Sequence, residues 1–425
     1  MAGREDIARK PQRRDTIPSV VRELSKPKSY VGRGEITTEY PVQAYVLALA
    51  EGFVPFDASP ELNDNFKQVD VMETLSNYAL EGLAEPELSL RERFKVGSRG
   101  KFVFSSGGND EILERIVTQL LRPYQRRVLG LYVAPYFTNM NMYAKRWGTN
   151  PDGSPVLPYY NVTTPLTTTV GETVDKTAQI ISSTRQRNLF VYLCNPNTPK
   201  GDSADIRQVI KLVEAAQDKD FLVVIDEDLG DALEDNQSAI PLTHYYNNLI
   251  VVRSMSKYLR LPGLRSGYAA MSKDLYDAYT KVQRPHDMNS LTQAFTIIAL
   301  RNEIALPHLE RTRQKVVEIK TNLLSYLNRA GVNFLPTDPR VPIFIVDGKR
   351  KDFHKRLARL RIETLSGSEF IGTHRGLTGR FARMSIPKDP DQIPVITYIV
   401  CLAAGIKPPN WLQEEVNKLN EAIEK

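Results

Sequence analysis

Short apolar runs alternate with longer amphipathic stretches between residues 100 and 255. The apolar runs lie at 102–104, 128–133, 189–193, 221–225 and 249–252, and each ends in polar or glycine residues. Apolar runs of this kind predict strands buried on both faces, and the amphipathic stretches between them predict helices. The pattern therefore predicts an α/β fold with a mostly parallel sheet. Ligands of such sheets bind at the carboxyl ends of the strands, so the polar residues after each run are the first candidates for chemistry.

A second pattern begins near residue 306. Helical stretches at 309–330 and 352–361 alternate there with short strands at 341–346 and 381–386. This alternation predicts a smaller α/β domain, to which we expect the N-terminal segment to contribute. The predicted organisation is an N-terminal arm at 1–40, a large domain at 41–305 and a small C-terminal domain at 306–425.

Composition narrows the class of protein. The 56 basic and 50 acidic side chains give a net charge of +6, but the two signs are interspersed, so no nucleic-acid partner is expected. Two cysteines, Cys194 and Cys401, cannot form a disulfide framework, and the five histidines lack metal-ligand spacing. The most apolar stretch, 393–406, is too short to span a membrane and predicts a buried helix. We expect a cytoplasmic enzyme with no metal and no membrane partner.

The strongest chemical signal is the segment after the apolar run at 249–252. Ser254, Ser256 and Lys257 come first, and Arg265 follows within Gly-Leu-Arg-Ser-Gly-Tyr. A lysine directly after a buried strand can present its amine as a nucleophile, while hydroxyls and a guanidinium suit a phosphate group. Each residue alone has an ordinary interpretation, a surface-loop lysine or an arginine at a helix cap. The combined spacing favours function.

This spacing resembles the class I/II aminotransferase family, the fold type I enzymes that use pyridoxal 5'-phosphate (PLP). The resemblance implies a large domain with a mostly parallel seven-stranded sheet and a smaller C-terminal α/β domain. It also implies that Lys257 forms the Schiff base with PLP and that Ser254, Ser256 and Arg265 bind the cofactor phosphate. Gly108 and Asn109, in Ser-Gly-Gly-Asn-Asp-Glu, are similar to the family's phosphate loop at a helix N-terminus.

Further motifs occur in the family's order, each with an ordinary alternative. Phe137 resembles the aromatic residue that stacks on the pyridine ring, or it packs in the core. Asp226 resembles the aspartate that pairs with the pyridine nitrogen, or it caps a helix. Arg383 resembles the arginine that binds the substrate carboxylate, although Arg380 is close and both could be surface charges. Tyr78 resembles the tyrosine that reaches the phosphate of the neighbouring subunit, which implies a homodimer with shared active sites.

Two positions depart from the family pattern. Thr198 stands where the family has an asparagine, and Leu229 stands where it has a tyrosine. Both family residues donate to the phenolic oxygen of the cofactor, and Asn197 is a candidate replacement donor. Lys200, in the same loop as Thr198, is either a specificity element or a solvated charge.

These departures leave two enzymatic interpretations open. One is an aminotransferase that moves an amino group between an L-amino acid and a 2-oxo acid in amino-acid metabolism. The other is a PLP-dependent lyase or cyclase that catalyses elimination, decarboxylation or cyclisation of an amino acid on the same scaffold. A non-catalytic protein on this fold is disfavoured by the intact Lys257, Asp226 and Arg265.

Overall fold

The computed structural model describes residues 33–34, 44–45, 47–50, 52, 54–57, 60–79, 83–121, 129–137, 139–146, 159–186, 189–284, 286–370 and 378–424. Most of the predicted arm at 1–40 lies outside these residues. Within the described ranges, no helix combines the length and the apolar character needed to cross a bilayer.

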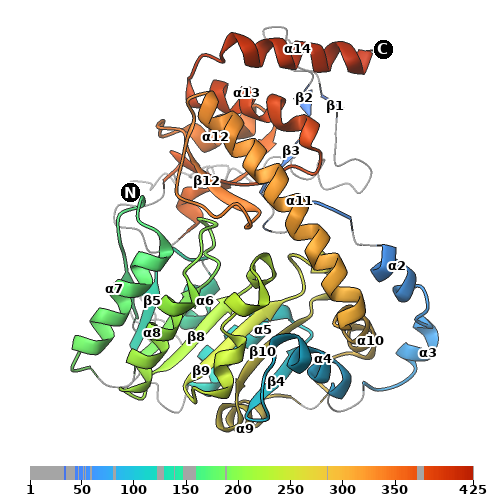
Figure 1. Ribbon diagram of the computed structural model, residues 1–425, viewed down its shortest axis with the longest axis vertical. Helices are drawn as coiled ribbons and strands as arrows, with labels where there is room; N and C mark the ends of the chain where they lie inside the picture. The colour runs from blue at the N-terminus through green and yellow to red at the C-terminus, as the bar shows by residue number, and fades with distance from the viewer. Residues whose placement is uncertain are drawn as a thin grey trace, which may run out of the picture.

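A seven-stranded sheet forms the lower part of the molecule (Figure 1). Its strands are β4 Gly100–Ser105, β5 Leu129–Val133, β6 Tyr159–Val162, β7 Leu189–Cys194, β8 Leu222–Glu227, β9 Leu249–Ser254 and β10 Gly267–Ser272. The spatial order is β4-β10-β9-β8-β7-β5-β6, and only β10 runs antiparallel to its neighbours. The predicted mostly parallel sheet is confirmed, with β6 and β10 in addition to the five predicted runs.

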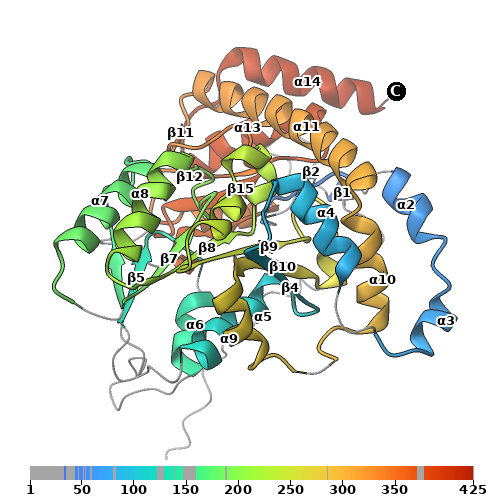
Figure 2. The ribbon, with the colours of Figure 1, turned by 60° about the horizontal axis from the view of Figure 1, so that its bottom comes forward.

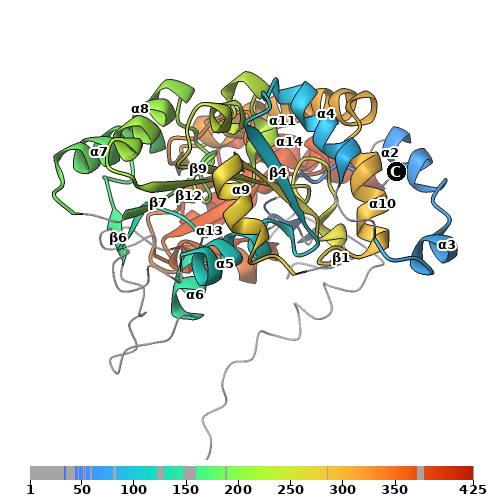
Figure 3. The same ribbon diagram turned by 90° about the horizontal axis from the view of Figure 1, so that it is seen from below.

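Helices cover both faces of this sheet. They are α4 Ala84–Phe94, α5 Gly108–Arg115, α6 Asn139–Arg146, α7 Val170–Ser183, α8 Ile206–Gln217, α9 Lys273–Thr280 and α10 Ser290–Ala299. Helices α7 and α8 lie on one side of the sheet, and α5, α6 and α9 lie on the other (Figures 2 and 3). Because both faces are covered, every residue of β7 and β9 is buried, as continuous apolar strands predict.

Successive residues of the central strands enter two different cores. In β7, Leu193 packs into the core beneath α7 and α8, while Tyr192 and Cys194 face the core beneath α5 and α6. The same alternation runs through β8, where Ile225 and Val224 belong to the two opposite cores. Side chains two residues apart therefore share a face, and this periodicity continues into the polar ends of the strands.

A second, antiparallel sheet lies in the upper part of Figure 1. Its order is β11 Asn333–Phe334, β12 Ile343–Asp347, β15 Phe381–Ser385 and β14 Leu365–Ser366. The helices α12 Phe353–Arg359, α13 Ile393–Ala404 and α14 Asn410–Glu424 belong to the same part. The predicted buried helix at 393–406 corresponds to α13, in which nine of twelve residues are buried.

The early part of the chain pairs with this upper part. Strand β3 Leu47–Ala48 is parallel to β13 Ile362–Glu363, and Leu49 bonds through its backbone to both Glu363 and Ser385. Earlier still, β1 Arg33–Gly34 pairs with β2 Ala44–Tyr45. The helices α2 Pro60–Phe66 and α3 Val71–Leu75 then lead the chain back toward the large sheet.

One long helix, α11 Asn302–Arg329, extends along both parts of the molecule. It begins beside α10 and reaches α13 at its other end (Figure 1). The predicted domain boundary between residues 305 and 306 falls inside this helix. The division of the chain into three domains stays a prediction.

A buried lysine fixes α11 to the loop that precedes β12. The Lys320 amino group lies within hydrogen-bond distance of four oxygens: Thr337 Oγ1 at 2.6 Å, and the carbonyls of Asp338, Val341 and Ile343 at 2.7, 2.6 and 2.8 Å. Burial lowers the pKa of Lys320 to about 7. Four oxygen acceptors around one nitrogen favour the ammonium form, because an ammonium carries three N–H donors and no acceptor. The contact is therefore structural, and it orders the loop at 337–343.

We expect Lys320→Met to lower the free energy of unfolding by about 2 to 4 kcal/mol, because it leaves several buried oxygens without a donor. Urea unfolding followed by circular dichroism measures the change. Lys211→Met, at an exposed position on α8, is the control and should shift stability little. A Lys320→Met protein as stable as this control would contradict the structural role.

Candidate active site

A cleft of about 320 Å³ lies between the large sheet and the small sheet. It is bounded on one side by the carboxyl ends of β7, β8 and β9, and on the other by Leu365 of β14 and Arg383 of β15. Nine of the eleven site residues predicted from the sequence line it: Asn109, Phe137, Thr198, Asp226, Ser254, Ser256, Lys257, Arg265 and Arg383. Of the other two, Gly108 adjoins Arg265, and Tyr78 lies outside the cleft.

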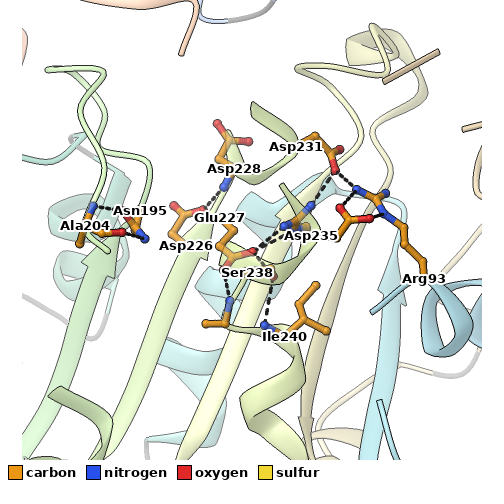
Figure 4. Close-up of polar contacts among 12 residues, drawn as sticks. Arg93, Asn195, Ala204, Asp226, Glu227, Asp228, Asp231, Asp235, Ser238 and Ile240 are labelled. Atoms are coloured by element: carbon orange, nitrogen blue, oxygen red, sulfur yellow. Dashed lines mark hydrogen bonds and ion pairs between the residues drawn. The ribbon is translucent and has the colours of Figure 1, made fainter. Parts of the chain in front are cut away.

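The two-residue alternation of the strands brings these polar groups together. Tyr192 of β7, Asp226 of β8 and Ser254 of β9 follow residues that face the α5 side of the sheet, and they continue that face. The intervening Glu227 and Arg253 point to the opposite side and bond to each other at 2.9 Å. Figure 4 shows Glu227 turned toward the charged cluster that includes Asp231, Asp235 and Arg93.

Asp226 is a buried carboxylate that receives only neutral donors. The Tyr192 hydroxyl donates to Oδ2 at 2.7 Å, and the Asp228 N–H and the Asn109 amide donate to Oδ1 at 3.1 and 3.4 Å. Among the described residues, no lysine or arginine nitrogen lies within ion-pair distance of it. Burial, followed by repulsion from Asp228, raises the pKa of Asp226 to about 7. A cationic group in the cleft would favour the ionised form.

Lys257 extends into the cleft from the loop after β9. Its amino nitrogen lies 3.1 Å from Asp228 Oδ2, and the two side chains are 25% and 18% exposed. The amine is therefore shielded from bulk water yet open to the cleft. Beside it, the Ser254 hydroxyl accepts a hydrogen bond from the Ser256 N–H at 3.0 Å, so the Ser254 hydroxyl is held near the end of the strand.

One corner of the cleft has the features of an anion site. Helix α5 begins at Gly108, and its N-cap Gly107 has no side chain to cap the first N–H groups. Arg265 Nη2 lies 3.3 Å from the Gly107 carbonyl and 3.4 Å from Asp110 Oδ2. Gly108 has a positive φ of 75°, and a Cβ there would lie 3.1 Å from Arg265 Nη2. Glycine thus allows the arginine to lie against the helix start.

Arg383 is a buried cation without a carboxylate partner among the described residues. One of its terminal nitrogens donates to the Ala50 carbonyl, and its buried Nε has no hydrogen-bond partner there. Burial lowers the pKa of Arg383 to about 10, so the side chain is still charged at neutral pH. Arg380, the alternative considered from the sequence, instead pairs with Asp347 at 2.5 Å and does not line the cleft.

The remaining predicted residues are also placed. Phe137 is 37% exposed and lines the cleft, with its ring centroid 6.1 Å from that of Phe370, so it is not a core residue. Thr198 and the buried Leu229 both line the cleft. Tyr78 is 87% exposed, and its ring lies 5.4 Å from His286.

Two neighbours of Thr198 have structural roles. Asn197, the candidate replacement donor, gives its amide to the Pro135 carbonyl at 2.8 Å and does not line the cleft. Lys200 is neither a solvated charge nor part of the cleft lining, because it forms a buried ion pair with Asp202 at 3.0 Å. The loop that carries Thr198 is thus fixed by its own polar side chains.

Sequence reasoning missed two residues of the site, Tyr192 and Asp228. Tyr192 appears as one aromatic residue within an apolar run, and its contact with Asp226 follows only once the strand register is known. Asp228 stands two residues after Asp226, and this spacing was a usable signal for a shared face.

A mostly parallel sheet that presents a lysine, a carboxylate and an anion-binding corner at its carboxyl edge belongs to the class of α/β enzymes that bind a phosphorylated cofactor there. The family model for aminotransferase class I and II matches residues 45–371, so the chain belongs to that family. Enzymes of this family use PLP.

Individual relatives are more distant. The histidinol-phosphate aminotransferase of Caldanaerobacter subterraneus subsp. tengcongensis is 26% identical over 60% of this chain and 66% of its own length. The aromatic amino acid aminotransferase of Mycolicibacterium vanbaalenii is 30% identical over 47% of this chain and 56% of its own length. The match thus spans less than two thirds of either relative.

Among solved structures, the histidinol-phosphate aminotransferase of Clostridium acetobutylicum superposes with a TM-score of 0.69. It is 17% identical and covers 84% of this chain and 99% of its own. At this identity the likeness establishes the fold, which is that of the fold type I enzymes.

The raised pKa of Asp226 predicts a pH-dependent effect of Asp226→Asn in the PLP-free protein. The unfolded carboxyl titrates near pH 3.9, so between about pH 4 and 7 the folded protein binds more protons and loses stability as the pH rises. Asparagine does not titrate. We therefore expect the variant to gain stability relative to the unchanged protein between pH 5 and pH 8, by about 3 kcal/mol at most.

Urea unfolding of both PLP-free proteins at the two pH values measures this difference. Groups that do not interact with Asp226 titrate alike in the two proteins and cancel. Asp277→Asn, which alters an exposed carboxylate on α9, is the control and should show a much smaller pH-dependent difference. A stability difference between Asp226→Asn and the unchanged protein that does not vary with pH would show that Asp226 is ionised throughout.

Proposed function

We propose that this protein is a PLP-dependent aminotransferase that moves an amino group between an L-amino acid and a 2-oxo acid. The observation that carries the proposal is the composition of one cleft. It contains a lysine amine, a buried carboxylate without a cation at Asp226, and a buried cation without a carboxylate at Arg383. A cofactor with a basic ring nitrogen and a substrate with a carboxylate would supply both missing charges.

The residues of the cleft fit PLP. Ser254, Ser256, Arg265 and the uncapped start of α5, with Gly108 and Asn109, would hold its phosphate. Phe137 would stack on its ring, and Thr198 lies close to the same group of residues. When bound, PLP supplies the electron sink for the electrons of a broken bond at the substrate α-carbon.

The protein's own residues then have distinct tasks. Lys257 would hold the cofactor as a Schiff base and, once displaced by substrate, take the proton from the α-carbon and later return it. Asp226, fixed by Tyr192, would keep the pyridine nitrogen protonated. Arg383 would bind the substrate carboxylate through two parallel N–H donors and so orient the α-carbon.

The names of the relatives indicate a range of amino-donor substrates for this family. The two relatives reported above act, by their names, on histidinol phosphate and on aromatic amino acids. We propose an amino-acid donor with a bulky side chain. Phe370 supports this proposal, because its ring centroid lies 5.8 Å from the Arg383 guanidinium, beside the point where the donor carboxylate would bind.

One observation favours a second candidate function. Leu229 and Thr198 line the cleft where the family pattern has two donors to the cofactor's phenolic oxygen, and Asn197 is committed elsewhere. A changed environment at that atom would suit a lyase or cyclase that uses the same residues. The two functions differ in their products.

We also propose a homodimer with shared active sites, located in the cytoplasm. Tyr78 supports the dimer, because its largely exposed side chain would be available to the phosphate of a second copy. Both cysteines are free and buried, in keeping with a reducing compartment. Sedimentation velocity tests the dimer: a single monomeric species of the PLP-loaded protein at micromolar concentration would refute it.

Product analysis of the PLP-loaded enzyme tests the function. We expect stoichiometric 2-oxo acid from the amino-acid donor and multiple turnovers only when a second 2-oxo acid is added as acceptor. Lys257→Ala should abolish both, because it removes the Schiff-base amine and the proton carrier. Release of ammonia, carbon dioxide or a cyclised product without an acceptor would establish the lyase or cyclase instead.

We expect Arg383→Gln to lower kcat/KM for the amino donor by about 30- to 1000-fold, which corresponds to about 2 to 4 kcal/mol for a desolvated, charge-assisted pair. The loss should appear mainly in KM and should be smaller for amines without a carboxylate. Steady-state kinetics with a matched amino acid and amine measure this split. Arg380→Gln is the matched control, since Arg380 pairs with Asp347 outside the cleft. Equal losses in the two variants would exclude Arg383 as the carboxylate ligand.

A further inference from the structure

Asp228 places a second carboxylate in the cleft, directly beside the reactive lysine. Its Oδ2 lies 3.1 Å from Lys257 Nζ, and its side chain is 18% exposed. The adjoining position is Leu229, whose apolar side chain lines the same cleft. The pair is therefore built into the site and differs from a solvated surface ion pair, which would contribute little.

The backbone around Asp228 is held from both sides. Its N–H donates to Asp226 Oδ1 at 3.1 Å, which closes a tight turn at the end of β8. The preceding Glu227 is anchored to Arg253 and Ser238. The following Asp231 is bonded to Arg253 and, as Figure 4 shows, to Arg93. These contacts fix the position from which the carboxylate reaches Lys257.

The charges around Asp228 show that Lys257 is the cation that stabilises its carboxylate. Asp226 repels it, as the raised pKa of Asp226 reflects. The Arg383 guanidinium attracts the Asp228 carboxylate from the small sheet, but among the described residues only Lys257 lies within ion-pair distance of it. A carboxylate can accept a hydrogen bond and cannot donate one when ionised, so its suitable partner in the cleft is the lysine ammonium.

We propose that Asp228 is a positioning residue that orients Lys257 and stabilises the ammonium that forms when Lys257 takes up the α-proton. This inference rests on the proposed function. When the Lys257 amine takes the α-proton of the substrate, the lone pair of Nζ forms the new N–H bond and the electrons of the C–H bond stay with the substrate and cofactor. The resulting ammonium is stabilised by the Asp228 carboxylate and oriented to return the proton. No other reactant is required.

The first test uses the PLP-free protein and does not depend on activity. The protein is treated with limiting acetic anhydride at pH 8, and acetylation of Lys257 is quantified by peptide mass spectrometry. An amine reacts and an ammonium does not, so we expect Asp228→Asn to speed acetylation of Lys257 at least threefold, while Asp228→Glu stays close to the unchanged protein. Asp277→Asn is the matched control, because it frees Lys273 from an exposed ion pair and should leave Lys257 unaffected.

The second test uses the PLP-loaded enzyme. We expect Asp228→Asn to lower the rate of the amino-donor half-reaction by about 10- to 100-fold, less than the roughly 100- to 10,000-fold that a positioned acid–base group itself contributes. KM should change less than threefold, and the isotope effect from an α-deuterated donor should rise because proton transfer becomes slower. Asp228→Ser serves as a second variant if Asp228→Asn does not fold, and Asp228→Glu should restore part of the rate.

The outcomes separate this inference from the proposed function. Unchanged acetylation of Lys257 together with an unchanged half-reaction in Asp228→Asn would overturn the positioning role and leave the aminotransferase proposal intact. A raised KM with unchanged kcat would also overturn it, since Asp228 would then be a ligand of the substrate side chain. If the unchanged enzyme forms no 2-oxo acid, the proposed function fails, and the acetylation result alone decides whether Asp228 holds the Lys257 ammonium.

Discussion

Three consecutive carboxylates at the end of β8 must be divided between two faces of one sheet. Strand geometry sends Asp226 toward the cleft and Glu227 to the opposite side. Burying Glu227 is tolerable only because Arg253, opposite it in the parallel register, binds it at 2.8 to 2.9 Å. Arg253 also binds Asp231, and Arg93 bridges Asp231 to Asp235. This buried ion cluster is what fixes the loop that begins the active site.

The cluster also connects the site to the rest of the molecule. Arg93 comes from α4, and Arg313 of the long helix α11 donates to the Asp231 carbonyl at 2.8 Å. Helix α11 in turn is bound through Lys320 to the loop before β12, whose neighbour β15 carries Arg383. Buried polar contacts, joined through the backbones of β8, α11 and the small sheet, thus connect the strand that carries Asp226 with the strand that carries Arg383. The distance between these two complementary charges is set by this frame.

The sequence anticipated the parts of this arrangement that local pattern controls. Apolar runs predicted β5, β7, β8 and β9 because those strands are buried on both faces. Strand β6, with the residues Tyr-Tyr-Asn-Val, lies at the sheet edge and is only partly buried, so its run is mixed. Strand β10 is Gly-Tyr-Ala-Ala-Met-Ser, whose small residues have weak strand preference and fit only because two strands flank it.

The site residues also fall into two groups, those that local sequence pattern predicts and those that depend on tertiary contacts. Motif spacing singled out Lys257, Asp226 and Arg383, which line one cleft in the structure, because each follows or lies in a strand whose sequence is distinctive. The contacts of Tyr192 with Asp226 and of Lys200 with Asp202 depend on strand register and loop burial, which a linear pattern does not contain. The burial of Lys200 cannot be predicted from the sequence for the same reason, since a lysine is usually solvated unless a carboxylate is buried with it.

The departure at Leu229 is best understood together with Asp228. A tyrosine hydroxyl can donate a hydrogen bond to an oxyanion, whereas an ionised carboxylate can only accept one. Asp228 therefore cannot substitute for the donor that the family pattern places at the next position. Its 3.1 Å contact with Lys257 shows where its charge acts instead. The tyrosine donor of the family pattern is thus absent at position 229, and the neighbouring Asp228 presents an acceptor to Lys257 instead.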